Sequence, residues 1–426
     1  MSDWQGVLDH AQAEGRLPSV AAGVLTDGQL TWTGSAGAET GPAVQYRIGS
    51  ITKTMTAALV LQCRDEGRLA LTDPIGRWVP ETGYRDATVG ALLSHTSGMQ
   101  SEPVGSWWER SPGVDFARLV ATNHAPIAEP GEYFHYSNLG YALLGEAVAR
   151  LAGMTWWELV SARLLGPLGM RQTSYHRMDP ATQGYSVHHF AGTLTPEPHR
   201  DTAAMAPAGQ LWSTVEDLTR WGAFLASGHP GILATSTLRK MARPVIASEE
   251  EYGLGLRQLE VDGHLLVGHT GSMPGFVATL FVEQESGDGV IALANATTGI
   301  SQTTLAAELW RGQPSTDVIA WRPSVSVPER VAQLLGLWYW GNSAVELRWH
   351  NGLLELHSLA LRMLEDRFDV TADHIVGTAG YHRGETLHVL RRADGSLSHL
   401  ECATFVFTRT PYDPTVPIPG GSPESR

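Results

Sequence analysis

The stretch Ser50-Ile51-Thr52-Lys53 begins a helical pattern and decides how the rest of the chain is interpreted. Side chains three positions apart share one face of a helix, so the Lys53 amine can reach the Ser50 hydroxyl. The free N–H groups and the positive dipole end at a helix start also suit a site where an oxyanion develops. The alternative is that Ser50 only caps the helix and Lys53 is solvated. The S-x-x-K pattern favours an activated serine nucleophile.

Lysine usage supports this interpretation. Of the 30 Lys and Arg residues only Lys53 and Lys240 are lysines, which leaves 28 arginines. A chain that uses Arg at nearly every generic cationic position has reason to keep Lys where a tunable amine is needed, because Arg stays protonated. Lys240 fits a solvated helix position. Lys53 is therefore the candidate for a catalytic amine.

A second motif, Tyr136-Ser137-Asn138, lies at the entrance of the helical pattern 138–152. A nearby positive charge lowers the pKa of a tyrosine, so Tyr136 could relay a proton to a leaving group. Asn138 offers a donor and an acceptor for an amide or ester group of a substrate. Taken alone, this motif favours a structural role, with a buried Tyr136 and an Asn138 that caps the helix.

The third motif, His269-Thr270-Gly271, ends a predicted strand and is followed by Ser272. Thr270 could donate to a substrate carboxylate or carbonyl, and Gly271 permits close approach of a backbone. The Ser272 N–H is predicted to complete an oxyanion hole with the Ser50 N–H. For His269 alone, a structural role on a strand is favoured.

In this order, S-x-x-K, Y-x-N and [KH]-T-G, the motifs resemble the penicillin-recognising serine hydrolases. These comprise class C β-lactamases, D,D-peptidases, D-aminopeptidases and family VIII esterases. Further matches lie at residues 92–98 and 207–213, and the resemblance covers about residues 5–312. Typical class C β-lactamases have Lys where this chain has His269, which counts against efficient β-lactam hydrolysis.

The resemblance implies an acyl-enzyme on Ser50 and assigns roles to the other motif residues. The amides of Ser50 and Ser272 would hold the oxyanion, and Lys53 and Tyr136 would share proton transfer, with the general base left open. It implies that the substrate is bound by Asn138, His269, Thr270 and Gly271.

The expected fold class is α+β, with a β-lactamase/transpeptidase-like antiparallel sheet flanked by helices. The sheet is predicted from both chain ends, and a large, mostly helical insertion lies between them. The predicted organisation is a serine hydrolase domain over 1–312, a linker over 313–328, a small C-terminal antiparallel β domain over 329–414 and a disordered tail over 415–426. In that domain, Asn351-Gly352 is a strong two-residue hairpin signal.

Composition and residue patterns argue against several classes of binding partner. The net charge of -14 argues against nucleic acid, since binding phosphates requires a basic surface. No 18-residue apolar run is present that could span a membrane. The adjacent His188 and His189 would point to opposite faces of a strand, which argues against a metal site. No cofactor and no metal are predicted.

Location and function follow from these features. Two cysteines and a polar N-terminus without a signal pattern predict a cytoplasmic protein. The leading prediction is a carboxylesterase or D-amino-acid-selective amidohydrolase that acts on small-molecule ester, amide or peptide substrates. The alternatives are a D,D-peptidase or class C-like β-lactamase, and a non-catalytic binding protein on the same fold. A homo-oligomer is compatible with the sequence.

Overall fold

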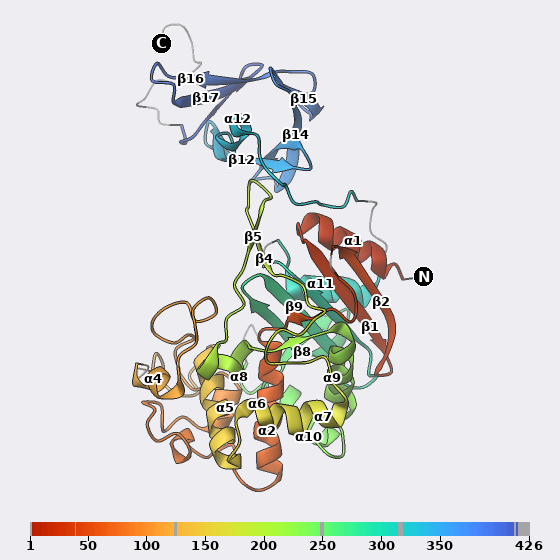
Figure 1. The fold of residues 1–426 in the computed structure, drawn as a ribbon, viewed down its shortest axis with the longest axis vertical. Coiled ribbons are helices and arrows are strands. Elements are labelled where there is room, and N and C mark those ends of the chain that lie inside the picture. The colour runs from red at the N-terminus through yellow and green to blue at the C-terminus, as the bar shows by residue number, and fades with distance from the viewer. Residues whose placement is uncertain are drawn as a thin grey trace. The chain divides into compact units, whose positions relative to one another are not determined.

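The chain divides into two compact units. The computed structural model describes residues 2–38, 40–122, 126–247, 251–297, 299–313, 318–412 and 415 (Figure 1). The first unit comprises Met1–Ser186 and Pro196–Ala320, and the second comprises Val187–Thr195 and Trp321–Arg426.

An antiparallel sheet forms the centre of the first unit, in the order β2-β1-β10-β9-β8-β7. Strands from both ends of the unit meet in it, because β1 pairs with β10 through the register Val20↔Ala294. At the β1–β2 turn, Asp27 and Gly28 both have positive φ, as a two-residue hairpin requires. The strands are β1 Ser19–Thr26, β2 Gln29–Gly37, β7 Arg257–Val261, β8 His264–Met273, β9 Phe276–Glu283 and β10 Gly289–Ala294.

Helices cover both faces of this sheet. Helices α1 and α11 pack on one side, and α9 and α2 pack on the other (Figure 1). The confirmed fold class is α+β, with most helices between β2 and β7. The helices are α1 Trp4–Glu14, α2 Ile51–Asp65, α3 Val89–Leu93, α4 Phe116–Ala121, α5 Asn138–Ala152, α6 Trp156–Val160, α7 Gly166–Leu168, α8 Ala206–Gly209, α9 Val215–Ser227, α10 Thr235–Ala242 and α11 Gln302–Arg311.

Helix α2 is the buried axis of this unit. Every residue from Ile51 to Cys63 is buried, and the helix packs on α5, α8, β8 and β9. A helix that is buried on all sides must satisfy its polar groups internally. Because α2 contacts both the helices α5 and α8 and the strands β8 and β9, it lies where the helical region meets the sheet. The short pair of β3 Tyr46–Arg47 with β6 Trp212–Ser213 completes the unit's strands. A second short pair, β4 Tyr185–Val187 with β5 Leu194–Pro196, includes the ends of the segment 187–195, which belongs to the second unit.

The second unit is an antiparallel β domain, as predicted. Its sheet has the order β15-β14-β13-β12-β11-β18-β17-β16, and a bridge between Val376 and Thr386 joins the two ends into a barrel. Its core includes the fully buried Trp338 and Phe368. The elements are α12 Glu329–Ala332, β11 Gly336–Trp340, β12 Ser343–His350, β13 Leu353–Ser358, β14 Met363–Val370, β15 Ile375–Gly380, β16 Leu387–Arg391, β17 Leu397–Cys402 and β18 Phe405–Thr408.

One segment differs from the predicted domain boundaries. Residues 187–195 were expected in the hydrolase domain, but they group with the second unit. The Trp349 amide donates to the Phe190 carbonyl at 2.7 Å, and His189 Nε2 lies 3.0 Å from a Glu346 carboxylate oxygen. These are long-range contacts, which a local pattern does not reveal. The predicted tail lies outside the described residues except for Thr415.

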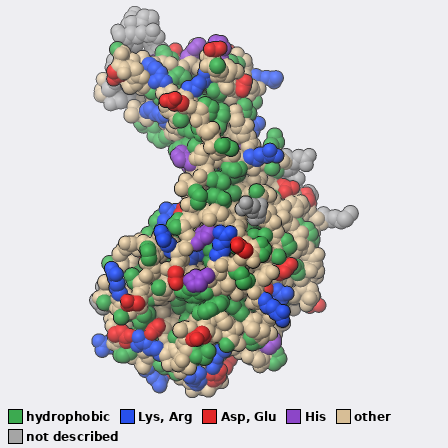
Figure 2. All heavy atoms as spheres, viewed as in Figure 1, with side chains coloured by type: hydrophobic (Ala, Val, Ile, Leu, Met, Phe, Trp, Pro, Cys, Tyr) green, Lys and Arg blue, Asp and Glu red, His purple; other side chains and the backbone are tan. Residues whose placement is uncertain are grey.

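Helix length, surface charge and the two cysteines complete the description of the fold. Among the described residues no helix is long and apolar enough to cross a membrane. Acidic and basic side chains are intermixed on the face of the first unit in view in Figure 2. Cys63 and Cys402 are both buried and free.

Candidate active site

Ser50 and Lys53 lie together at the start of α2. Ser50 occupies the N-cap position, yet its side chain makes no capping hydrogen bond. Instead the Lys53 amine donates to the Ser50 Oγ at 2.9 Å. Lys53 is fully buried, so the alternative of a solvated lysine does not hold. The predicted i, i+3 contact is present.

Two glycines allow β8 to approach Ser50. A methyl group placed on Gly49 would lie 2.5 Å from the Ser272 amide nitrogen. One placed on Gly271 would lie 1.9 Å from the Ile48 carbonyl oxygen and 3.2 Å from the Ser50 nitrogen. Because neither position has room for a side chain, the backbones of residues 48–50 and 271–272 are in close contact. The amides of Ser50 and Ser272 therefore belong to the same small region.

The Lys53 amine has two further acceptors. It donates to the Asn138 Oδ1 at 2.5 Å and to the Ala208 carbonyl at 2.7 Å. Burial lowers the pKa of Lys53 to about 7, and the carboxylates of Glu102 and Glu109 oppose that shift. An amine with this pKa exchanges its proton near neutral pH.

Asn138 is the first residue of α5 and not its cap. The Ser137 hydroxyl accepts from the Gly140 N–H at 3.0 Å and is the cap. The Asn138 side chain links Lys53 to Glu102, because its Nδ2 donates to Glu102 Oε1 at 2.5 Å. Each of its polar atoms has one partner, and the second Nδ2 N–H leaves a donor for the predicted contact with substrate.

Tyr136 lies beside Lys53. The amine nitrogen is 5.0 Å from the centre of the Tyr136 ring, and the Tyr136 hydroxyl has no hydrogen-bond partner among the described residues. Burial, strengthened by the neighbouring Tyr252, raises the pKa of Tyr136 well above its usual value, although Ser50 lowers it in part. The sequence predicted a lowered pKa, whereas here burial outweighs the nearby amine.

The side chain of His269 is buried and bonded to its protein neighbours. Its Nδ1 donates to the Thr270 carbonyl at 2.5 Å, and its Nε2 accepts from the Tyr252 hydroxyl at 3.1 Å. Burial, aided by Arg257, lowers its pKa well below the usual value, so the imidazole is neutral. These contacts correspond to the structural role for His269, and its contact with substrate stays a prediction.

A second buried histidine supports Tyr136. The ring of His95 lies 4.2 Å from the Tyr136 ring, and its Nδ1 accepts from the Ser137 N–H at 3.0 Å. Its pKa is also well below the usual value, chiefly through burial. The 92–98 segment, noted in the sequence only as a further motif, thus fixes the position of Tyr136.

Thr270 has a cationic neighbour. Arg257, on the adjacent strand β7, has its Nη1 3.5 Å from the Thr270 Oγ1. Both side chains are half-buried. The Thr270 hydroxyl thus lies next to a guanidinium group, and a substrate carboxylate would meet both.

An acidic loop that contains Glu102 and Glu109 also lies near Lys53. Glu102 is exposed, accepts from Asn138, and also accepts from the Trp108 indole at 2.6 Å. A methyl group on Gly209 would touch both Trp108 and the Gly49 carbonyl carbon, at 3.6 and 3.7 Å, so this loop reaches the nucleophile segment. Burial raises the pKa of Glu109 in the same loop.

Sequence reasoning missed Glu102, Arg257 and the Ala208 carbonyl. The first two lie in an irregular loop and on an edge strand, where periodicity carries no signal. The carbonyl belongs to the 207–213 segment, which was noted as a motif without a role. Among the described residues no group of three or more His, Cys, Asp or Glu side chains is arranged to hold a metal ion.

Comparisons with known proteins identify relatives of this chain. Beta-lactamase-like protein 2 of Dictyostelium discoideum is 28% identical over 265 residues, which cover 56% of this chain and 48% of that protein. The chain therefore spans about half the length of this relative. A D-stereospecific amidohydrolase from Streptomyces sp. is 28% identical, with a TM-score of 0.62, and the match covers 72% of this chain and 99% of that one.

The fold extends over nearly the whole chain in one solved structure. The octameric penicillin-binding protein homologue from Pyrococcus abyssi has a TM-score of 0.66 at 23% identity, and the match covers 95% of this chain and 99% of that one. Residues 327–409 match a domain family of unknown function. Residues 4–312 match the Beta-lactamase family, and this chain, with its serine and lysine hydrogen-bonded at the start of α2, belongs to that family.

Proposed function

We propose that the protein is a serine hydrolase that works through an acyl-enzyme on Ser50. The Ser50 Oγ attacks the acyl carbon of an ester or amide while its proton passes to Lys53. The amides of Ser50 and Ser272 stabilise the oxyanion of the tetrahedral intermediate. Tyr136 gives its proton to the leaving group and receives the one held by Lys53. Water then releases the acyl group by the reverse sequence.

Lys53 is the general base in this proposal. Its pKa of about 7 leaves a large fraction of neutral amine at physiological pH. In that form the Lys53 nitrogen keeps two N–H donors and can accept from the Ser50 hydroxyl across the same 2.9 Å contact. Burial raises the pKa of Tyr136, so Tyr136 remains a phenol and acts as a donor. The single observation that carries the proposal is the Lys53–Ser50 hydrogen bond in a buried site.

The preferred substrates are amides or esters that bear a positively charged amine. Glu102 and Glu109 place negative charge beside Lys53, and the side chains of the acidic loop reach the nucleophile segment. A substrate ammonium group would be attracted to this side of the site. Similarity to the D-stereospecific amidohydrolase supports a D-amino-acid amide as the amine-bearing substrate. This favours an amidohydrolase over a simple carboxylesterase.

A substrate panel tests the proposal. We expect release of ammonia from D-alanine amide to exceed that from its N-acetyl form by at least about tenfold, because acetylation removes the charge. Ser50→Ala should abolish hydrolysis of both, and a fluorophosphonate probe should label the parent at Ser50. Full activity of Ser50→Ala would refute the mechanism, and absence of labelling would favour a non-catalytic binding protein.

A second candidate function is a D,D-peptidase or class C-like β-lactamase. The observation that favours it is Arg257 beside Thr270, which could bind the carboxylate of a peptide or β-lactam. Nitrocefin turnover that is faster than D-alanine amide turnover, and that Arg257→Gln removes while Glu102→Gln preserves, would establish this alternative. Faster turnover of D-alanine amide that Glu102→Gln removes and Arg257→Gln preserves would support the amidohydrolase.

Location and assembly remain proposals as well. We expect the protein in the cytoplasm, which fractionation of the native host would test. The relative from Pyrococcus abyssi is octameric, and a homo-oligomer of this chain would be detected by light scattering of the full-length protein.

A further inference from the structure

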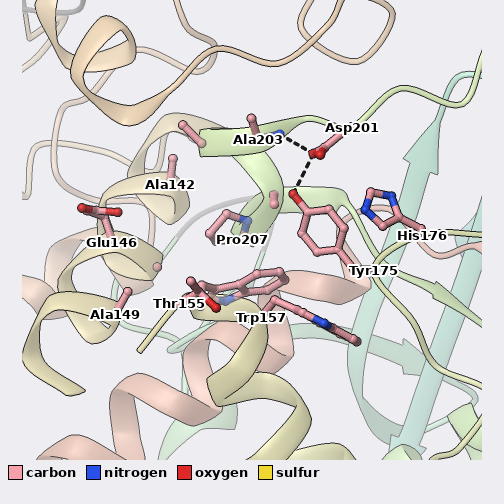
Figure 3. Close-up of a pocket in the computed structure, with 14 residues that line it drawn as sticks. Ala142, Glu146, Ala149, Thr155, Trp157, Tyr175, His176, Asp201, Ala203 and Pro207 are labelled. Carbon is pink, nitrogen blue, oxygen red and sulfur yellow. Dashed lines mark hydrogen bonds between the residues drawn. The ribbon is translucent and has the colours of Figure 1, made fainter. Parts of the chain in front are cut away.

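A pocket of about 440 Å³ lies in the first unit (Figure 3). Its walls come from α5, the start of α6, Tyr175, His176 and the segment 201–207. Ser50, Lys53 and Tyr136 do not line it. Its volume is in the range of small-molecule sites.

The pocket is hollow because α5 presents small side chains to it. Ala142, Gly145 and Ala149 lie on one face of that helix. A methyl group on Gly145 would lie 2.2 Å from the Pro207 Cγ, so Gly145 allows Pro207 to pack closely and form one wall. These residues leave room for a ligand while the walls remain packed.

Aromatic rings form another part of the wall. The ring centres of Trp157 and Tyr175 are 5.9 Å apart in an edge-to-face arrangement. Trp156, which is 6% exposed, donates from its indole nitrogen to the Thr56 hydroxyl at 3.0 Å, so its ring is held in place. The faces of Trp and Tyr rings attract cations.

The charged groups of the lining are acidic. Glu146 and Asp201 face the pocket from opposite sides (Figure 3), and the lining contains no Lys or Arg among the described residues. Asp201 Oδ1 accepts from the Tyr175 hydroxyl at 2.7 Å and from the Ala203 N–H at 2.8 Å. Asp201 Oδ2 has no hydrogen bond among the described residues. Glu146 pairs with Arg150 at 2.6 Å, and Asp201 interacts electrostatically with the buried Arg47. The Asp201 Oδ2 is the carboxylate oxygen that a ligand cation would meet.

We propose that this pocket binds a small organic cation, with an apolar body and a quaternary or alkyl ammonium group. The apolar part lies against the α5 face and Pro207. The ammonium group lies among Trp156, Trp157 and Tyr175, next to Asp201. A neutral molecule of the same shape lacks the attraction to the rings and the carboxylate.

Choline and its neutral isostere 3,3-dimethyl-1-butanol test the charge requirement. Both are titrated into the full-length protein, with binding followed by saturation-transfer NMR on the ligand. We expect choline to bind about tenfold more tightly than the alcohol. Equal binding of the two, or no binding of choline, would overturn the proposal.

Variants locate the binding site. Asp201→Asn keeps the acceptor for Tyr175 but removes the charge, and Trp157→Ala removes a ring; each should weaken choline binding about five- to tenfold. Glu285→Gln and Trp340→Ala are the matched controls, since both side chains are exposed elsewhere. Thermal melts check that each variant is folded.

One more variant tests whether choline binds beside Ser50 and not in the proposed pocket. Glu102→Gln alters the acidic loop beside Ser50 and should leave choline binding unchanged. Loss of binding in Glu102→Gln with retention in Asp201→Asn would place the cation in the catalytic cleft and refute the proposed site. The proposal is independent of the substrate of the enzyme.

Discussion

Replacing Glu102 by Gln should shift the pH dependence of acylation to lower pH. Asn138 and Trp108 donate to different oxygens of Glu102, so the single amide oxygen of Gln can keep only one of these two bonds. The variant therefore removes the negative charge together with one acceptor. That charge stabilises the protonated form of Lys53 and therefore raises its pKa. Without it, the Lys53 pKa falls below its present value of about 7.

The size of the shift follows from the bridge through Asn138. Two hydrogen bonds of 2.5 Å, with the amide between them, separate the ammonium from the carboxylate by about 7 Å at most. The interaction is then ~0.6 kcal/mol in a water-like medium and ~2.4 kcal/mol at an effective dielectric of about 20. Glu102 is exposed, so screening keeps the effect toward the lower value. Since one pKa unit corresponds to ~1.4 kcal/mol, we expect a decrease of about half to one unit.

The assay is kcat/KM for p-nitrophenyl butyrate between pH 5 and 9, because this quantity reports groups of the free enzyme. The neutral ester avoids any direct effect of Glu102 on a charged substrate. The kcat/KM of the parent should rise with a midpoint near pH 7, and that of the variant should rise with a midpoint at lower pH. The difference between the two midpoints should be smaller at high salt, because salt screens the charge of Glu102. Glu285→Gln, which alters an exposed carboxylate in the turn between β9 and β10, should leave the midpoint unchanged. A Glu102→Gln midpoint that stays fixed or moves upward would refute the assignment of Lys53 as the base.

Three further changes test other parts of the structure. Tyr136→Phe should lower kcat/KM at least about tenfold but keep the midpoint near pH 7, since Lys53 sets it; loss of the rising limb would instead identify Tyr136 as the base. Gly271→Ala should slow single-turnover acylation about 100-fold, because the added methyl meets the Ile48 carbonyl at 1.9 Å and pushes β8 away; near-normal acylation would contradict the close approach. Trp338→Ala should cost about 3–5 kcal/mol in urea unfolding of the β domain, and a change below about 1 kcal/mol would contradict its place in the core.

Features fixed by a few neighbouring residues could be predicted from the sequence. Helix α5 spans Asn138–Ala152 as expected, because Gly153 ends it in the left-handed conformation at φ 68°. Asn351 and Gly352 both adopt positive φ and connect β12 to β13, as their two-residue turn signal predicts. The contact between Ser50 and Lys53 could be predicted for the same reason, since it depends only on helix geometry.

Features that depend on packing between distant segments could not be predicted. Nothing local marks Arg257 as a neighbour of Thr270, because the contact depends on the pairing of β7 with β8. The pKa of Tyr136 was predicted in the wrong direction, since the sequence indicates the nearby amine but not the depth of burial. Glu102 was overlooked because loops lack periodicity.

The two lysines of the chain connect its composition with its chemistry. At the position of Lys53 an Arg could also donate to Asn138 and to the Ala208 carbonyl, but it would remain charged in a fully buried place. Burial that would only destabilise a permanent cation instead lowers the pKa of an amine to about 7. The same burial keeps Tyr136 protonated and His269 neutral. Thus one physical condition, exclusion of water around the start of α2, produces both the base and the proton donor that the proposed reaction needs.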